Sequence, residues 1–100
     1  MVKHIILWTL REELSAEEKA TIKNEIKTGL EGLKDVIPGI LDIKVNINGL
    51  PSSNADLMLD SSFESVEALK NYAVHPAHVN VADTKVRPYT AVRSCLDFEA

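Results

Sequence analysis

Hydrophobic and polar residues alternate along four stretches of the chain, and this pattern predicts four β-strands. The predicted strands span residues 2–10, 40–48, 55–63 and 90–99. Side chains point to opposite faces of a sheet in turn, so alternation marks a strand with one buried face. In the second predicted strand, the residues expected on the buried face are Leu41, Ile43, Val45 and Ile47. The first strand is apolar on both faces, so we expect both to be covered.

Two other stretches carry apolar residues at helical spacing. Between residues 16 and 35 the apolar positions recur every three or four residues, which predicts an amphipathic helix; they are Ile22, Ile26, Leu30 and Leu33. Ser15 and Glu18 form a capping box at its start. A second helix is predicted to follow Ser65 and to stop near residue 75, because the residue before Pro76 is pushed out of the helical conformation. Pro76 then opens a short helical turn over residues 77–83.

The order of these elements is strand, helix, strand, strand, helix, strand. This order predicts an α+β domain of ferredoxin-like βαββαβ type, with a four-stranded antiparallel sheet and both helices on one face. A single domain is expected over residues 1–100. The helices can cover only one face, yet the first strand, Met58 and Ala91 place apolar side chains on the other. The sequence therefore predicts a homodimer in which two sheets pack face to face.

Composition narrows the class of protein further. A chain of 100 residues that is 45% hydrophobic and 26% charged is typical of one soluble globular domain. The net charge of −4 and the lack of a basic run argue against nucleic acid and anionic membrane surfaces as partners. No apolar run approaches the length of a membrane span. The single Cys95 cannot form an internal disulfide, which favours a cytoplasmic location, and its place within a strand predicts an inert small hydrophobic residue.

The candidate chemistry is concentrated in residues 71–79, which contain two of the three histidines and one of the two tyrosines. In one unbroken helix, Tyr72 and His78 would lie about 240° apart around the axis. The break at His75 allows His78 to turn toward the side that Tyr72 faces. If His4 lies on the helix-covered face of the sheet, the three rings meet in an apolar cavity. The residues expected to line it with His4 are Ile6, Trp8, Leu69 and Val79.

This set of side chains predicts proton transfer without a cofactor. Histidine exchanges protons near neutral pH, and a tyrosine hydroxyl donates a hydrogen bond to a developing enolate oxygen. The expected ligand is a small apolar carbonyl compound, the expected reaction an aldol-type cyclisation or an isomerisation, and the catalytic candidates are His78 and Tyr72. Non-catalytic interpretations stay open, in which both are core residues and the protein is a dimeric stress or accessory protein. His75 is then a helix-terminating cap near the last carbonyls.

A metal site is not predicted. His75 and His78 have the spacing of half such a site, but Asp83 is the one nearby residue that could complete it.

Short segments along the whole chain resemble the stress-responsive dimeric α/β-barrel (Dabb) family. They are residues 2–7, 37–40, 63–65 and 87–89, together with Tyr72 and the His-Pro-Ala-His run at 75–78. The resemblance implies a ferredoxin-like fold and a homodimer whose two sheets form a barrel. One family member, a plant polyketide cyclase, uses a histidine and a tyrosine at the positions of His78 and Tyr72, with a supporting histidine at that of His4. The resemblance thus implies an aldol or proton-transfer role, and related dimeric barrels add a cofactor-independent monooxygenase as an alternative.

Overall fold

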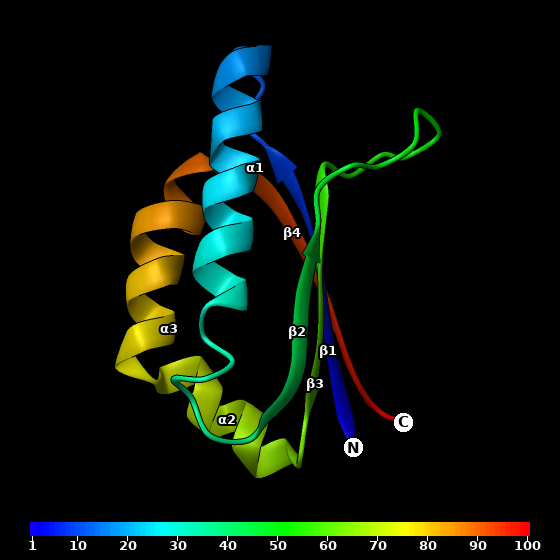
Figure 1. Ribbon diagram of the computed structural model, residues 1–100. Helices are drawn as coiled ribbons and strands as arrows, with labels where there is room; N and C mark the ends of the chain where they lie inside the picture. Colours follow the sequence, from blue (N-terminus) through cyan, green and yellow to red (C-terminus); the bar gives the residue numbers. More distant parts are fainter.

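Four antiparallel strands form one sheet, and the helices all lie on one of its faces in the computed structural model, which describes residues 1–100 (Figure 1). In chain order the elements are β1 (Val2–Leu10), α1 (Ala16–Glu31), β2 (Ile40–Asn46), β3 (Leu57–Phe63), α2 (Val66–Val74), α3 (Pro76–Val81) and β4 (Thr90–Glu99). A π-helical turn over Ala82–Val86 and a 3₁₀ turn over Arg87–Tyr89 connect α3 to β4. The strand order is β2-β3-β1-β4. The ferredoxin-like α+β prediction is confirmed.

The first helix begins where the sequence predicts and ends earlier. The Ser15 hydroxyl accepts a hydrogen bond from the Glu18 N–H, and the Glu18 carboxylate accepts one from the Ser15 N–H. These reciprocal bonds satisfy two N–H groups at the start of α1. The helix ends at Glu31 rather than near residue 35, and Gly32 is its C-cap. A Cβ at Gly29 would lie 3.0 Å from Cγ1 of Val81, so this glycine lets α1 approach α3 closely.

The buried face of β2 differs from the prediction. Leu41, expected in the core, is 44% exposed, whereas Ile40 is buried. The pairing of β2 with β3 shifts register between Ile40 and Asp42. Such an irregularity adds one residue to one strand and reverses the alternation beyond it. The prediction for Ile43 and Val45, which follow the shift, is confirmed.

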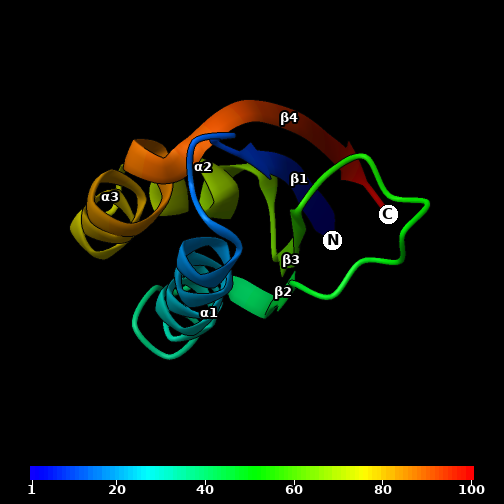
Figure 2. The ribbon, with the colours of Figure 1, turned by 90° about the horizontal axis from the view of Figure 1, so that it is seen from above.

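The core fills the layer between the sheet and the helices, and Figure 2 shows this layer from above.

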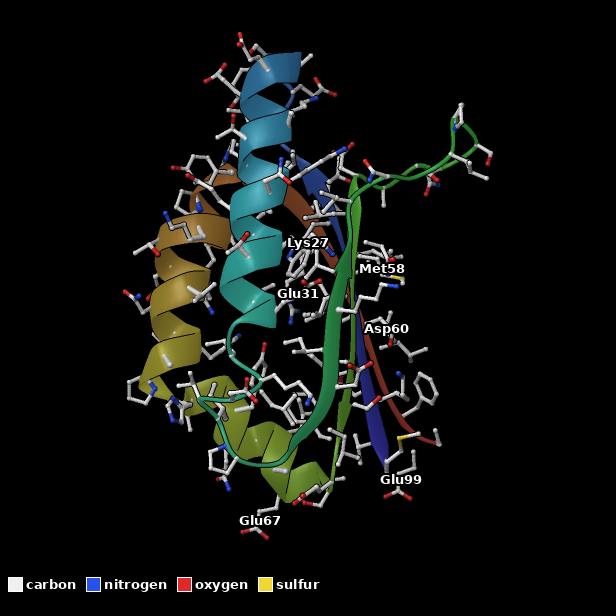
Figure 3. The ribbon with its side chains drawn as sticks, viewed as in Figure 1. Lys27, Glu31, Met58, Asp60, Glu67 and Glu99 are labelled. Atoms are coloured by element: carbon white, nitrogen blue, oxygen red, sulfur yellow. The ribbon has the colours of Figure 1, made fainter.

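Side chains of α1 also protect the outer edge of β2. Lys27 Nζ donates to the Val45 carbonyl at 2.8 Å, and the Val45 N–H donates to the Glu31 carboxylate at 2.9 Å. Figure 3 shows Lys27 and Glu31 reaching from α1 toward the sheet. The edge groups of Val45 are thereby satisfied and are unavailable for pairing with another strand.

The opposite face of the sheet is covered by no helix (Figure 2). We call it the free sheet face; its apolar members are Ile5, Leu7, Met58, Val92, Leu96 and Phe98. Four of these are exposed by 41% to 63%: Leu7, Val92, Leu96 and Phe98. Met58 and Asp60 project from this side in Figure 3. No helix of the chain has both the length and the apolar character that crossing a membrane requires.

Candidate functional site

The break between α2 and α3 positions the two candidate catalytic residues. His75 ends α2 with an extended backbone, at φ −64° and ψ 133°, and Pro76 is the first residue of α3. The predicted break is confirmed. The role expected for the His75 imidazole is wrong in one respect: it caps the start of α3, not the end of α2. Its Nδ1 accepts a hydrogen bond from the Ala77 N–H at 3.1 Å, because the free N–H groups at a helix start need acceptors.

The break brings His78 back to Tyr72. The centroids of the two rings are 4.3 Å apart, with the planes tilted by 39°. His4 contacts the Tyr72 ring edge-on at 6.2 Å, and Phe63 lies 4.9 Å from the same ring. His4 therefore lies on the helix-covered face of β1, and residues from the first strand, α2 and α3 meet at one place.

The rings of His4, Tyr72 and His78 line a cavity of about 210 Å³ between the sheet and the helices, which we call the site cavity. Six of the seven site residues predicted from the sequence line it: His4, Ile6, Trp8, Leu69, Tyr72 and His78. Val79 is half-buried and does not line it. Successive residues of a helix point about 100° apart, so Val79 cannot share the direction of His78. Sequence reasoning missed Arg87 and Arg93, which add positive charge to the lining.

The Tyr72 hydroxyl is buried in the site cavity without a hydrogen-bond partner from the chain. The residue is 1% exposed. A buried polar group that lacks a partner costs about 1–3 kcal/mol, so such groups are uncommon in folded proteins. Burial also raises the pKa of the Tyr72 phenol above its ordinary value, which keeps it a neutral hydrogen-bond donor at neutral pH. The hydroxyl is therefore available to a ligand.

His78 is held in one tautomer by the backbone. Its Nδ1 lies 3.1 Å from the carbonyl oxygen of Ala73. A carbonyl only accepts, so the proton of neutral His78 sits on Nδ1 and the lone pair on Nε2. Burial lowers the pKa of the imidazole, the bond to Ala73 opposes this shift, and the nearby charges of Arg87, His4 and Arg93 add to it. His78 is therefore neutral at neutral pH and has a basic nitrogen.

His4 is paired with an acid that sequence reasoning missed. Its Nδ1 contacts the carboxylate of Asp97, which is directly opposite it in the β1–β4 ladder. Cys95, expected to be an inert small hydrophobic residue, is exposed, and its sulfur lies 3.5 Å from the same carboxylate. The alternation of β4 signals that Cys95 and Asp97 share a face, but the partner of that face depends on the register. Nδ1 of His75 and Nδ1 of His78 each bond a different backbone group.

The strand order and the helices on one face define the chain as a small α+β domain of ferredoxin-like fold, with a histidine–tyrosine cavity between its sheet and helices. The family model of the stress-responsive A/B barrel domain (Dabb) matches residues 2–100. The chain belongs to this family.

Relatives with known sequences or structures differ in the activities that their names carry. Olivetolic acid cyclase from Cannabis sativa is 27% identical over 85 residues, which cover 82% of this chain and 80% of the cyclase. A dimeric ferredoxin-like protein of unknown function from Bacteroides fragilis is 35% identical, with a TM-score of 0.92 and coverage of 99% of this chain and 95% of that one. A hydroxynitrile lyase from Passiflora edulis shares the fold at 19% identity, with a TM-score of 0.73 and coverage of 97% and 90%. Family membership therefore fixes the fold and leaves the reaction open.

Proposed function

We propose that the chain binds a small apolar carbonyl compound in the site cavity and catalyses proton transfer next to the carbonyl, as in aldol-type cyclisation or isomerisation. The observation that carries this proposal is the buried, unpartnered Tyr72 hydroxyl beside the ring of a neutral His78. A buried polar group of this kind calls for an explanation, and a ligand that accepts its hydrogen bond supplies one. The name of the cyclase relative is consistent with such chemistry.

Each residue has one role in the proposed reaction. Nε2 of His78 takes a proton from the carbon next to the carbonyl; the electron pair of the broken C–H bond forms the C=C bond of an enolate, and the π pair of the carbonyl moves to its oxygen. The Tyr72 O–H donates a hydrogen bond to that oxygen as negative charge develops on it. His4, fixed by Asp97, packs against the Tyr72 ring and holds it in place. No cofactor is required, because the carbonyl itself accepts the electron pair.

The cavity limits the size and polarity of the ligand. Its volume of about 210 Å³ is below the range of about 300–1,000 Å³ that is typical of drug-sized ligands. Its apolar walls include Trp8 and Leu69, and Arg87 and Arg93 are the cationic groups of its lining. A compact apolar ketone or aldehyde fits these properties.

We further propose that the protein is a homodimer that buries the free sheet face of both copies. An exposed apolar patch of this kind marks an interface. The Bacteroides fragilis relative is described as dimeric. Leu96→Asp would put a charge on this face at a residue that is 63% exposed in the single chain. Sedimentation should then change from the mass of two chains to that of one, with unchanged helical content; an 11.0 kDa species for the wild-type chain would contradict the proposal.

The reaction can be tested without knowing the natural substrate. NMR in D₂O measures the exchange of protons next to the carbonyl in a panel of small aryl and alkyl ketones. His78→Gln should slow the exchange catalysed by the protein by about 10²–10⁴-fold, the usual contribution of a general base. His75→Asn is the matched control, because it removes an imidazole from the same segment and keeps a side chain that can cap α3.

The proposal fails if wild-type protein exchanges no member of the panel faster than buffer, or if His78→Gln keeps the full rate. Thermal shifts with the same panel then separate the alternatives. Stabilisation without exchange would indicate a binding protein, and no stabilisation would favour a non-catalytic accessory role.

A further inference from the structure

A second hollow lies between α2 and β4, on the same side of the sheet as the helices. This α2–β4 groove has a volume of about 640 Å³ and is lined by Leu69 and Lys70 of α2 and by Cys95 and Asp97 of β4. His4 lines both this groove and the site cavity. The groove lies along β4, the edge strand of the sheet, and Phe98 of the free sheet face also borders it.

Three different metal-binding side chains meet in the groove. The β1–β4 register places Asp97 opposite His4, and Cys95 lies two residues earlier on the same face of β4. The Cys95 sulfur is 3.9 Å from His4 Nδ1 and 3.5 Å from the Asp97 carboxylate oxygen. His4 Nδ1 and the Asp97 carboxylate are in direct contact with each other. All three donor atoms lie within 4.8 Å of one another.

We propose that His4, Cys95 and Asp97 bind a divalent transition-metal ion of the zinc type. Zinc takes nitrogen, sulfur and oxygen ligands at about 2.0–2.3 Å, which in a tetrahedron places the ligand atoms about 3.4–3.6 Å apart. The two distances to the Cys95 sulfur are close to this spacing. The Asp97 side chain is 47% exposed and free to rotate away from His4 as the ion enters. These three side chains would leave a fourth position for water or an added ligand.

Charge and rigidity also favour an ion of this type. A thiolate and a carboxylate together balance the charge of a divalent cation, and the imidazole adds a nitrogen ligand. The His4 imidazole is prepositioned, since it is 8% exposed and packs edge-on against Phe63 and Tyr72. Sulfur and nitrogen donors select zinc-type ions over Mg²⁺ and Ca²⁺, which prefer oxygen ligands.

Titration with Co²⁺ tests the site, because Co²⁺ takes the same ligands as zinc and a thiolate ligand gives a charge-transfer absorption in the near ultraviolet. We expect one Co²⁺ per chain with this absorption, displaced by Zn²⁺. Cys95→Ser should abolish the absorption, and Asp97→Asn should weaken binding by at least about 10-fold, since changes to less direct partners of a metal already cost about 10–100-fold. Glu99→Gln is the matched control, because it removes the next carboxylate on the same face of β4, and it should change the affinity by less than about 2-fold.

Three results would overturn the proposal: no Co²⁺ bound by the folded wild-type chain, Co²⁺ bound without the thiolate absorption, or equal binding by Asp97→Asn and wild type. Both substituted residues are exposed, and circular dichroism verifies that the variants are folded. The absorption requires no turnover, so this inference stands or falls separately from the proposed reaction.

Discussion

Replacement of Tyr72 by phenylalanine should make the protein more stable and less active. The change removes one oxygen from a side chain that is 1% exposed and leaves the ring in place. The ring contacts with Phe63 at 4.9 Å and with His78 at 4.3 Å are retained. The removed hydroxyl has no hydrogen-bond partner in the chain.

The size of the effect follows from the cost of burying such a group. An unsatisfied buried hydroxyl costs about 1–3 kcal/mol, so we expect the free energy of unfolding to rise by about 1 kcal/mol, at the low end of this range. For a domain of this size, 1 kcal/mol raises Tm by about 4–8 °C. The same variant should lose about 10²–10³-fold in ketone proton exchange, the usual effect of removing one donor to a developing oxyanion.

Urea denaturation at matched protein concentration measures the stability change, because the unfolding of a dimer depends on concentration. Tyr89→Phe is the control; the ring is half-buried, and we expect a change within about 0.5 kcal/mol. A fall of 1 kcal/mol or more for Tyr72→Phe, on the scale of a lost hydrogen bond, would refute the reasoning. It would show that the hydroxyl stabilises the fold and is not held available for a ligand.

Three further predictions concern titration and packing. Burial lowers the pKa of His78, so this residue contributes stability that is present above its unfolded pKa of about 6.5 and is lost as pH falls through the lower folded value. His78→Gln should therefore reduce the pH dependence of the free energy of unfolding in that interval. Burial raises the pKa of Glu31, but hydrogen bonds from Lys27 and the Val45 N–H outweigh this effect, and the net shift is downward. Urea unfolding of Glu31→Gln should therefore show a free energy of unfolding lower by about 1 kcal/mol at pH 7, while Glu25→Gln, whose partner Lys85 is 4.0 Å away, should change it little. Gly39 has φ +92° and a Cβ there would lie 2.7 Å from the Ala68 Cβ, so Gly39→Ala should cost at least about 1–2 kcal/mol by the same assay; no loss would mean that the turn rearranges freely.

The parts of the fold that sequence predicts are those set by neighbours along the chain. The capping box at Ser15 and the break at Pro76 appear as expected, because each depends on residues within three or four positions. The sequence predicts that α1 ends near residue 35 and that Leu41 is buried, and both predictions are wrong. Both depend on other elements: α1 stops where the chain turns back toward the sheet, and Leu41 is exposed by a register shift against β3.

The same division holds for the candidate site. Tyr72 and His78 lie six positions apart, and a local break is enough to predict that they meet. The pairing of His4 with Asp97 joins residues 93 positions apart and depends on the register of β1 against β4. A slip of one residue would turn Asp97 to the free sheet face and remove it from His4. Alternation gives the faces of each strand but not this register, so the sequence alone does not predict the pairing of His4 with Asp97.

The position of His4 connects the two hollows. One ring nitrogen contacts Asp97 in the α2–β4 groove, while the ring packs on Tyr72 in the site cavity. A metal ion at Nδ1 takes the lone pair of that nitrogen and leaves Nε2 as a hydrogen-bond donor. Binding of a metal ion in the groove would therefore fix the tautomer of the histidine that packs against the proposed oxyanion donor. Because this coupling passes through a single buried ring, proton exchange measured with and without Zn²⁺ reports it directly, and identical rates at saturating metal would show that the two hollows act independently.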